Sequence, residues 1–84
     1  MRGHPKVKSV TPLPCKHLKI TFANGVTKVY DCTPLTNEQP FARLQDEALF
    51  RNVRADPAGY GVIWNDEIDL SEAELWIHGS VEPT

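Results

Sequence analysis

Hydrophobic and polar residues alternate in the two segments that flank Asn24-Gly25, residues 17–23 and residues 26–32. A period of two is typical of β-strands that bury one face and expose the other. Asn and Gly tolerate positive φ angles better than other residues do, and a two-residue hairpin loop needs such angles at both positions. The pattern therefore predicts a β-hairpin with a type I′ turn at residues 24 and 25.

The predicted turn determines which side chains of the hairpin share a face. It forms a buried face from four apolar residues, Leu18, Ile20, Phe22 and Val29. The exposed face then carries three cross-strand pairs: Lys19 with Tyr30, Thr21 with Lys28, and His17 with Cys32. A shift by one residue would exchange the two faces, so the register decides which residues are available for function.

A further strand is expected before the hairpin. Residues 6–13 are rich in β-branched side chains, and the segment ends at Pro12-Leu13-Pro14. Proline cannot donate a hydrogen bond to a sheet and is therefore confined to strand ends and edges. Together with the hairpin, this segment predicts a three-stranded antiparallel start to the fold.

Helical turns are expected between Pro40 and Val53. Apolar residues recur there every three or four positions, which is the period of an amphipathic helix. Proline suits the first turn of a helix, and the side chain of Asp46 is placed to cap a second short helix over residues 47–52. The pattern predicts two helical turns with a kink between them, and it assigns four residues to the core, Phe41, Leu44, Leu49 and Phe50.

Two further strands and a C-terminal helix complete the predicted elements. The strands are Val53–Ala55 and Val62–Trp64, on either side of a segment rich in turn residues. Ser71 followed by Glu74 matches a capping box, which marks the start of a helix, and Gly79 supplies its end. The predicted fold class is therefore α+β.

The whole chain is expected to be one domain, residues 1–84, with a core over about residues 6–79 and a flexible C-terminal tail over residues 80–84. Eighty-four residues are too few to close two separate cores, and 40% hydrophobic with 24% charged residues is an ordinary globular composition. No apolar run approaches the roughly 20 residues that cross a bilayer, and the N-terminus lacks the apolar stretch of a secretory signal. We therefore expect a cytoplasmic protein without a membrane partner.

Charge is distributed unevenly along the chain. Residues 1–30 carry six lysines and arginines and no carboxylate, whereas residues 31–84 carry three arginines and eleven acidic residues. Lys19 and Lys28 form a candidate basic face for nucleic acid or a small ligand. Because the lysines lack arginine clusters or interleaved aromatic residues, the favoured interpretation is attraction to the acidic half of the same fold or of a second copy.

Cys15, His17 and Cys32 form a candidate metal or thiol site. The predicted register makes His17 and Cys32 neighbours, and Cys15 lies two residues from His17 on the same face. Two thiolates and an imidazole are good zinc ligands, but no fourth ligand is evident in the sequence. Incidental cysteines are the favoured interpretation, so we expect no metal, no cofactor and no disulfide.

A candidate partner-binding surface contains Tyr60, Trp64, Asn65, Asp66 and Asp69. Core or half-buried packing is the favoured interpretation of the aromatic residues Tyr60, Trp64 and Trp76. Tyrosine and tryptophan also often mark contact surfaces, and Trp64 precedes polar residues in an expected loop, where binding residues tend to lie. No phosphate-binding glycine loop and no Ser-His-Asp order is present, so we expect no enzyme. The leading hypothesis is a non-enzymatic protein-interaction or regulatory module. Its expected partner is another protein, for example one encoded next to it, or a second copy.

Three segments of the chain resemble a known family: Leu18–Gly25, Pro40–Arg54 and Gly59–Trp76. Together they resemble the small bacterial family called domain of unknown function 2442, over roughly residues 6–79. This chain has Asn65-Asp66-Glu67 where many members have Pro-Asn-Gly, which is typical of a variant subgroup.

The resemblance implies a fold and no established activity. The implied fold is a three-stranded antiparallel start, helical turns, two more strands and a final helix. Some relatives are fused to helix-turn-helix domains, and others look like the small partner in two-gene, toxin–antitoxin-like arrangements. These associations imply a partner-binding or sensing module, by analogy at the level of the fold.

Overall fold

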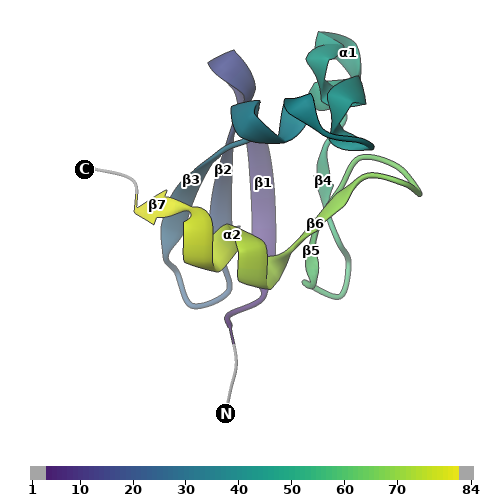
Figure 1. The fold of residues 1–84 in the computed structure, drawn as a ribbon. Coiled ribbons are helices and arrows are strands. Elements are labelled where there is room, and N and C mark those ends of the chain that lie inside the picture. The colour runs from purple at the N-terminus through teal and green to yellow at the C-terminus, as the bar shows by residue number, and fades with distance from the viewer. Residues whose placement is uncertain (1–3, 82–84) are drawn as a thin grey trace.

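Seven short strands form two antiparallel sheets in the computed structural model, which describes residues 4–81 (Figure 1). The first sheet has the order β1-β2-β3-β7, with β1 (Val7–Leu13), β2 (His17–Phe22), β3 (Thr27–Asp31) and β7 (Ser80–Val81). The second sheet has the order β4-β5-β6, with β4 (Arg54–Ala55), β5 (Gly61–Ile63) and β6 (Asp69–Ser71). The prediction of an α+β fold is confirmed.

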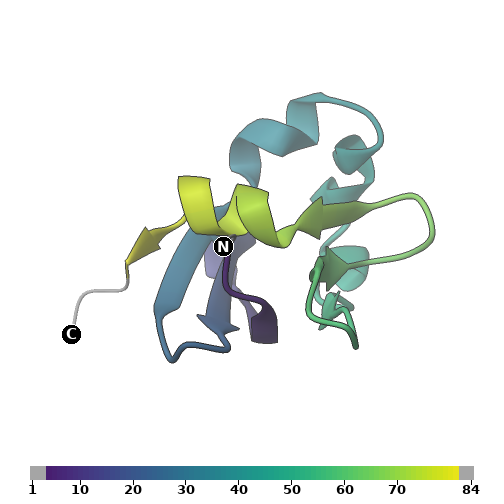
Figure 2. The ribbon, with the colours of Figure 1, turned by 90° about the horizontal axis from the view of Figure 1, so that it is seen from below.

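The helical segments are short. Two are α-helices, α1 (Glu47–Phe50) and α2 (Glu72–His78), and three are 3₁₀ turns, Pro14–Lys16, Thr33–Asn37 and Phe41–Gln45. Seen from below, α2 lies across one face of the first sheet and connects the second sheet to β7 (Figure 2). No helix in residues 4–81 is long and apolar enough to cross a membrane.

The hairpin between β2 and β3 has a register one residue away from the predicted one. The Phe22 N–H donates to the Val26 carbonyl at 2.8 Å, and the Gly25 N–H donates to the Phe22 carbonyl at 2.9 Å, so three residues form the loop. Gly25 has a φ of +91°, whereas Asn24 is outside the positive-φ region and accepts a hydrogen bond from the Val26 N–H. Three-residue loops with glycine at the left-handed position are the common alternative to the type I′ turn, which was wrongly predicted here.

This shift exchanges the two faces of β3 relative to β2. Leu18 pairs with Tyr30, and Ile20 pairs with Lys28. Tyr30 therefore points inward and is 5% exposed, whereas Val29, the predicted core residue, pairs with Lys19 on the outer face. The prediction holds for the inner face of β2 and is wrong for β3.

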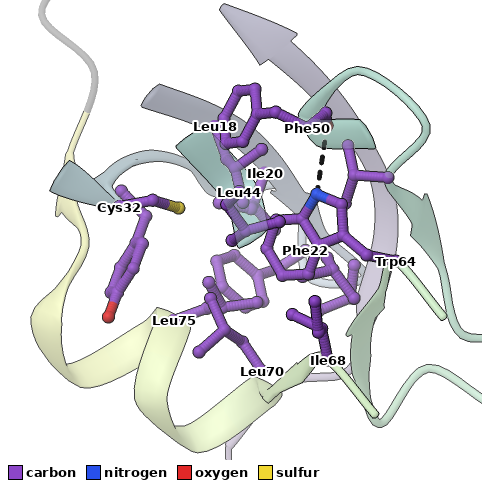
Figure 3. Packing of buried hydrophobic residues seen from close by; sticks show 14 residues of the cluster. Leu18, Ile20, Phe22, Cys32, Leu44, Phe50, Trp64, Ile68, Leu70 and Leu75 are labelled. Carbon is purple, nitrogen blue, oxygen red and sulfur yellow. Dashed lines mark hydrogen bonds between the residues drawn. The ribbon is translucent and has the colours of Figure 1, made fainter. Parts of the chain in front are cut away.

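One hydrophobic core is shared by both sheets and the helical turns (Figure 3). The largest fully buried side chains include Phe22 from β2, Phe50 from α1 and Leu75 from α2. The Trp64 indole N–H donates to the Phe50 carbonyl at 3.0 Å, which satisfies its polar atom inside the core. Leu44 and Phe50 are buried as predicted, and Phe41 and Leu49 pack against the cluster as partly buried side chains.

Two helix caps are formed as the sequence predicts. The Asp46 side chain accepts from the Ala48 N–H at 3.0 Å, and the Ser71 hydroxyl accepts from the Glu74 N–H at 3.1 Å. The Glu74 carboxylate does not complete the capping box among the described residues and instead accepts from the Tyr30 hydroxyl at 2.8 Å. The carboxylate of the predicted box therefore anchors α2 to β3.

Two of the strands, β6 and β7, are absent from the prediction. Ser80 and Val81 of β7 pair with Val29 and Lys28 of β3, so the prediction of a flexible tail over residues 80–84 is wrong at residues 80 and 81. Residues 82–84 lie outside the described residues. The strand β7 could not be predicted because two residues are too few to show an alternating pattern. The pairing that defines β7 also involves a segment that is distant in the sequence.

Candidate functional site

A hollow of about 160 Å³ lies on the second sheet. The pairs Gly61–Ser71 and Ile63–Asp69 place four of its residues on one face of the strands, because side chains two apart share a face. The intervening residues, Val62 and Leu70, are buried members of the core. The complete lining is Asp56, Tyr60, Gly61, Val62, Ile63, Asp69, Leu70 and Ser71.

Gly61 makes the close approach of β5 and β6 possible. Its φ is +153°, and a Cβ at this position would lie 1.9 Å from the Leu70 carbonyl oxygen. No other residue type fits such a contact without a shift of the backbone. Glycine at this position therefore allows the close approach of the two strands that line the hollow.

Tyr60 stands at the rim of the hollow and is 59% exposed. Its N–H donates to the Asp56 carboxylate at 3.2 Å, and its carbonyl accepts from the Glu72 N–H at 2.9 Å. The Lys6 ammonium lies 4.1 Å from the centre of the Tyr60 ring, which is a cation–π distance. The backbone of an exposed aromatic residue is thus held from both sides.

The turn before Tyr60 is attached to both sheets. The Asp56 carboxylate also accepts from the Ala58 N–H at 2.9 Å, as aspartate does in tight turns. The Gly59 carbonyl accepts from the Val7 N–H of β1 at 2.9 Å. These bonds fix one wall of the hollow before any ligand arrives.

The two carboxylates of the hollow have no cationic partner within residues 4–81. Asp69 is exposed, and Asp56 bonds only to the backbone of its own turn. Some carboxylates elsewhere form ion pairs: Lys16 contacts Glu47, and Arg43 lies 3.8 Å from Glu67. The hollow therefore combines an aromatic rim, which Lys6 contacts, with two carboxylates that form no ion pair among residues 4–81.

Only part of the predicted partner-binding surface comes together here. Tyr60 and Asp69 line the hollow, whereas Trp64 is 3% exposed and belongs to the core, which agrees with the favoured core packing and not with the alternative of a loop contact. The Asn65 side chain accepts from the Glu67 and Ile68 N–H groups and shapes the turn between β5 and β6. Asp66 is exposed on that turn, outside the hollow.

Asp56, Gly61 and Ser71 line the hollow and were not predicted as site residues. Their sequence context predicts a turn and a helix cap, and these predictions are correct for Asp56 and Ser71. These residues could not be predicted as site residues without the pairing of β5 with β6, which brings residues 61 and 71 to the same face. A prediction of Asp69–Ser71 as a strand would have made this pairing evident.

The predicted basic face is not formed. Lys19 shares the outer face of the first sheet with Val29, whereas Lys28 pairs with Ile20 on the inner face. The Lys28 ammonium lies 3.9 Å from the centre of the Trp76 ring and donates to the Trp76 carbonyl. The one-residue shift thus turns a predicted surface lysine into an anchor for α2.

The predicted cluster of Cys15, His17 and Cys32 also depends on the wrong register. His17 pairs with Asp31, and its Nε2 lies 3.9 Å from the Asp31 carboxylate. Cys32 is buried, and burial, followed by the charge of Asp31, raises the pKa of its thiol to about 12. Cys15 is exposed at the turn between β1 and β2. In the described part of the chain, no three His, Cys, Asp or Glu residues are grouped to hold a metal ion.

Comparison with known proteins gives one result. The family model described as protein of unknown function (DUF2442) matches residues 7–79 of the 84-residue chain. Neither the curated proteins nor the solved structures gave a significant match.

Proposed function

The chain belongs to the DUF2442 family of proteins of unknown function, and we propose that it is a non-enzymatic protein-interaction module. It contacts its partner through the hollow on the second sheet, with Tyr60 as the anchor. The observation that carries this proposal is the exposed Tyr60 ring, 59% accessible, at the rim of the hollow.

The position of Tyr60 supports an interface more than a structural role. Tyrosine is enriched among residues that dominate binding energy, because it presents a large amphipathic surface with little conformational entropy to lose. The adjoining backbone is held by hydrogen bonds to Asp56 and Glu72, so little ordering is required on binding. The ring itself contributes nothing to the buried core.

A second candidate mode is self-association through β7. This strand lies at an edge of the first sheet, and Val81 on it is 67% exposed. Ile77 on α2 is 59% exposed. An uncovered strand edge with apolar side chains nearby is a template for pairing with a second chain.

Photo-cross-linking tests these two modes against each other. We would place benzoylphenylalanine at position 60, 77 or 11, in the full chain, in cells of the source organism. Position 11 lies on β1, and Ile77 matches Tyr60 in exposure. We expect one protein to be captured repeatedly from position 60 and not from the other two positions.

The captured protein then allows a quantitative test in purified form. Tyr60→Ala should weaken its binding at least about tenfold, a loss of about 1.4 kcal/mol, because truncation of an interface anchor typically costs more than 1 kcal/mol. Ile77→Ala should change the affinity less than twofold. Capture of a second copy from position 77, with none from position 60, would replace the proposal by self-association at β7.

A further inference from the structure

We propose that the hollow on the second sheet recognises an arginine side chain of the partner protein. This inference rests on the proposed function and adds the chemistry of the group that is bound. It follows from the charge, the aromatic rim and the size of the hollow, taken together.

The negative charge of the carboxylates that line the hollow favours a cation as its ligand. Asp56 and Asp69 both line the hollow, and neither has a cationic partner in residues 4–81. An anionic group such as a phosphate would meet repulsion from two carboxylates at this position. A divalent metal is disfavoured because the described residues contain no group of three suitable ligands.

The aromatic rim favours a planar cation. Lys6 already places its ammonium 4.1 Å from the centre of the Tyr60 ring, which shows that this ring holds a cation at its face. A guanidinium group stacks on aromatic rings, and its fork of N–H donors matches carboxylate oxygens. Arginine therefore uses both the ring and the aspartates, whereas lysine offers a compact, strongly hydrated point charge.

The size of the hollow suits a single side chain better than a larger ligand. Its volume of about 160 Å³ is below the roughly 300–1,000 Å³ of small-molecule sites. Ile63 and Gly61 on its lining offer an apolar surface for the methylene groups of arginine. The hollow thus fits the end of one long side chain that projects from a partner surface.

The direct test is a titration of the ¹⁵N-labelled full chain, followed by amide chemical shifts. The probe is acetyl-Gly-Arg-Gly-amide, and its matched control is the same peptide with citrulline, which keeps the shape and removes the charge. We expect the arginine peptide to shift the amides of Tyr60, Gly61 and Asp69 with a Kd on the order of 1–10 mM, and citrulline to leave them unchanged. Equal shifts with both peptides, or none at these residues with arginine, would overturn the proposal.

Three variants sharpen this test, each checked for an unchanged amide spectrum outside the hollow. Asp69→Asn should weaken arginine binding about two- to fivefold, because an exposed ion pair contributes modestly. Asp66→Asn, on the neighbouring turn, is the control and should change the Kd less than 1.5-fold. Lys6→Met keeps the aliphatic stem, removes the competing ammonium, and should strengthen binding about twofold. Loss of affinity in Lys6→Met, or equal effects of the two aspartate variants, would contradict the inference.

This titration and the cross-linking experiment can fail separately. Capture from position 60 with no response to arginine would leave the interface in place and overturn the arginine site. A specific response to arginine without capture from position 60 would support the arginine site and overturn the proposed interface.

Discussion

The two sheets of this protein acquire their shape in different ways. Strands β1, β2 and β3 are five to seven residues long and are held by apolar burial, with Leu18, Ile20 and Phe22 fully inside. Strands β4, β5 and β6 have two or three residues each. Around them, Asp56 and Asn65 accept backbone hydrogen bonds that burial alone does not provide.

This difference separates the residues that stabilise the fold from those of the proposed binding site. The first sheet uses its inner face for the core and leaves a mainly polar outer face, with Thr21 opposite Thr27 and Lys19 opposite Val29. The second sheet uses its inner face for the same core and its outer face for the hollow at Tyr60. Substitutions on the inner face of the first sheet should therefore lower the free energy of unfolding, whereas substitutions of exposed side chains at the hollow should affect binding.

The largest expected effect is the loss of a core ring from the first sheet. Phe22→Ala should reduce the free energy of unfolding by about 3–5 kcal/mol, because it opens a cavity and removes the edge-to-face contact with Trp76, whose ring centre lies 5.0 Å away. Urea unfolding followed by fluorescence measures this loss. Tyr60→Ala is the matched aromatic variant and should cost less than about 0.5 kcal/mol. Similar losses in the two variants would contradict the division of roles.

The second-largest expected loss of stability concerns Gly61, where β5 and β6 approach each other closely. Gly61→Ala should cost about 3 kcal/mol or more, since its Cβ would lie 1.9 Å from the Leu70 carbonyl oxygen. Gly25→Ala also has a positive φ but has nothing within 4 Å of the added Cβ, so it should cost about 1 kcal/mol. The difference between the two variants in urea unfolding isolates the steric contact. A smaller loss at residue 61 than at residue 25 would show that β5 and β6 do not approach so closely.

An effect of intermediate size should appear at high pH. Burial, followed by the hydrogen bond to Glu74, raises the pKa of Tyr30 above its ordinary value of 10.0. The fold therefore favours the neutral phenol, and this stabilisation is present below pH 10 and lost as the pH rises further. Tyr30→Phe should cost about 1–2 kcal/mol at pH 8 and weaken the alkaline loss of stability. Urea unfolding at pH 8 and pH 11 measures both, and an equal alkaline loss in the variant would exclude Tyr30 as the cause.

The smallest effect is expected at the helix caps. Ser71→Ala removes the hydrogen bond from the Glu74 N–H and should reduce the free energy of unfolding by about 1 kcal/mol. Asp46→Ala should act similarly at α1. Ser80→Ala, on the exposed edge strand, is the control and should stay within about 0.5 kcal/mol in the same urea experiment. A Ser71→Ala loss no larger than that of the control would show that the cap does not stabilise α2.

Local signals in the sequence predicted local structure. The alternation in β2, the proline-bounded strand β1 and the caps at Asp46 and Ser71 each depend on residues within a few positions of one another. The local sequence did not determine the register of the hairpin, because Asn-Gly is compatible with both a two-residue and a three-residue loop. Contacts with α2 favour the second: the Tyr30 hydroxyl reaches Glu74, and Lys28 reaches Trp76.

The site was predicted only in part for the same reason. Tyr60 and Asp69 were selected because tyrosine often marks contact surfaces and because polar residues follow Trp64 in an expected loop, and both line the hollow. For Trp64, core packing and a loop contact both stayed open in the sequence, because its hydrogen-bond partner, the Phe50 carbonyl, lies on another element. The pairing of β5 with β6 places Ser71 across from Gly61, and no local sequence pattern predicts this pairing.

The pairing of β7 with β3 has a consequence for synthesis on the ribosome. The outer edge of β3 remains open from the time residues 27–31 emerge until Ser80 and Val81 arrive to pair with Val29 and Lys28. A nascent strand with an unpaired edge is prone to associate with other chains. The first sheet is therefore completed only after the strands of the second sheet, residues 54–71, have been made.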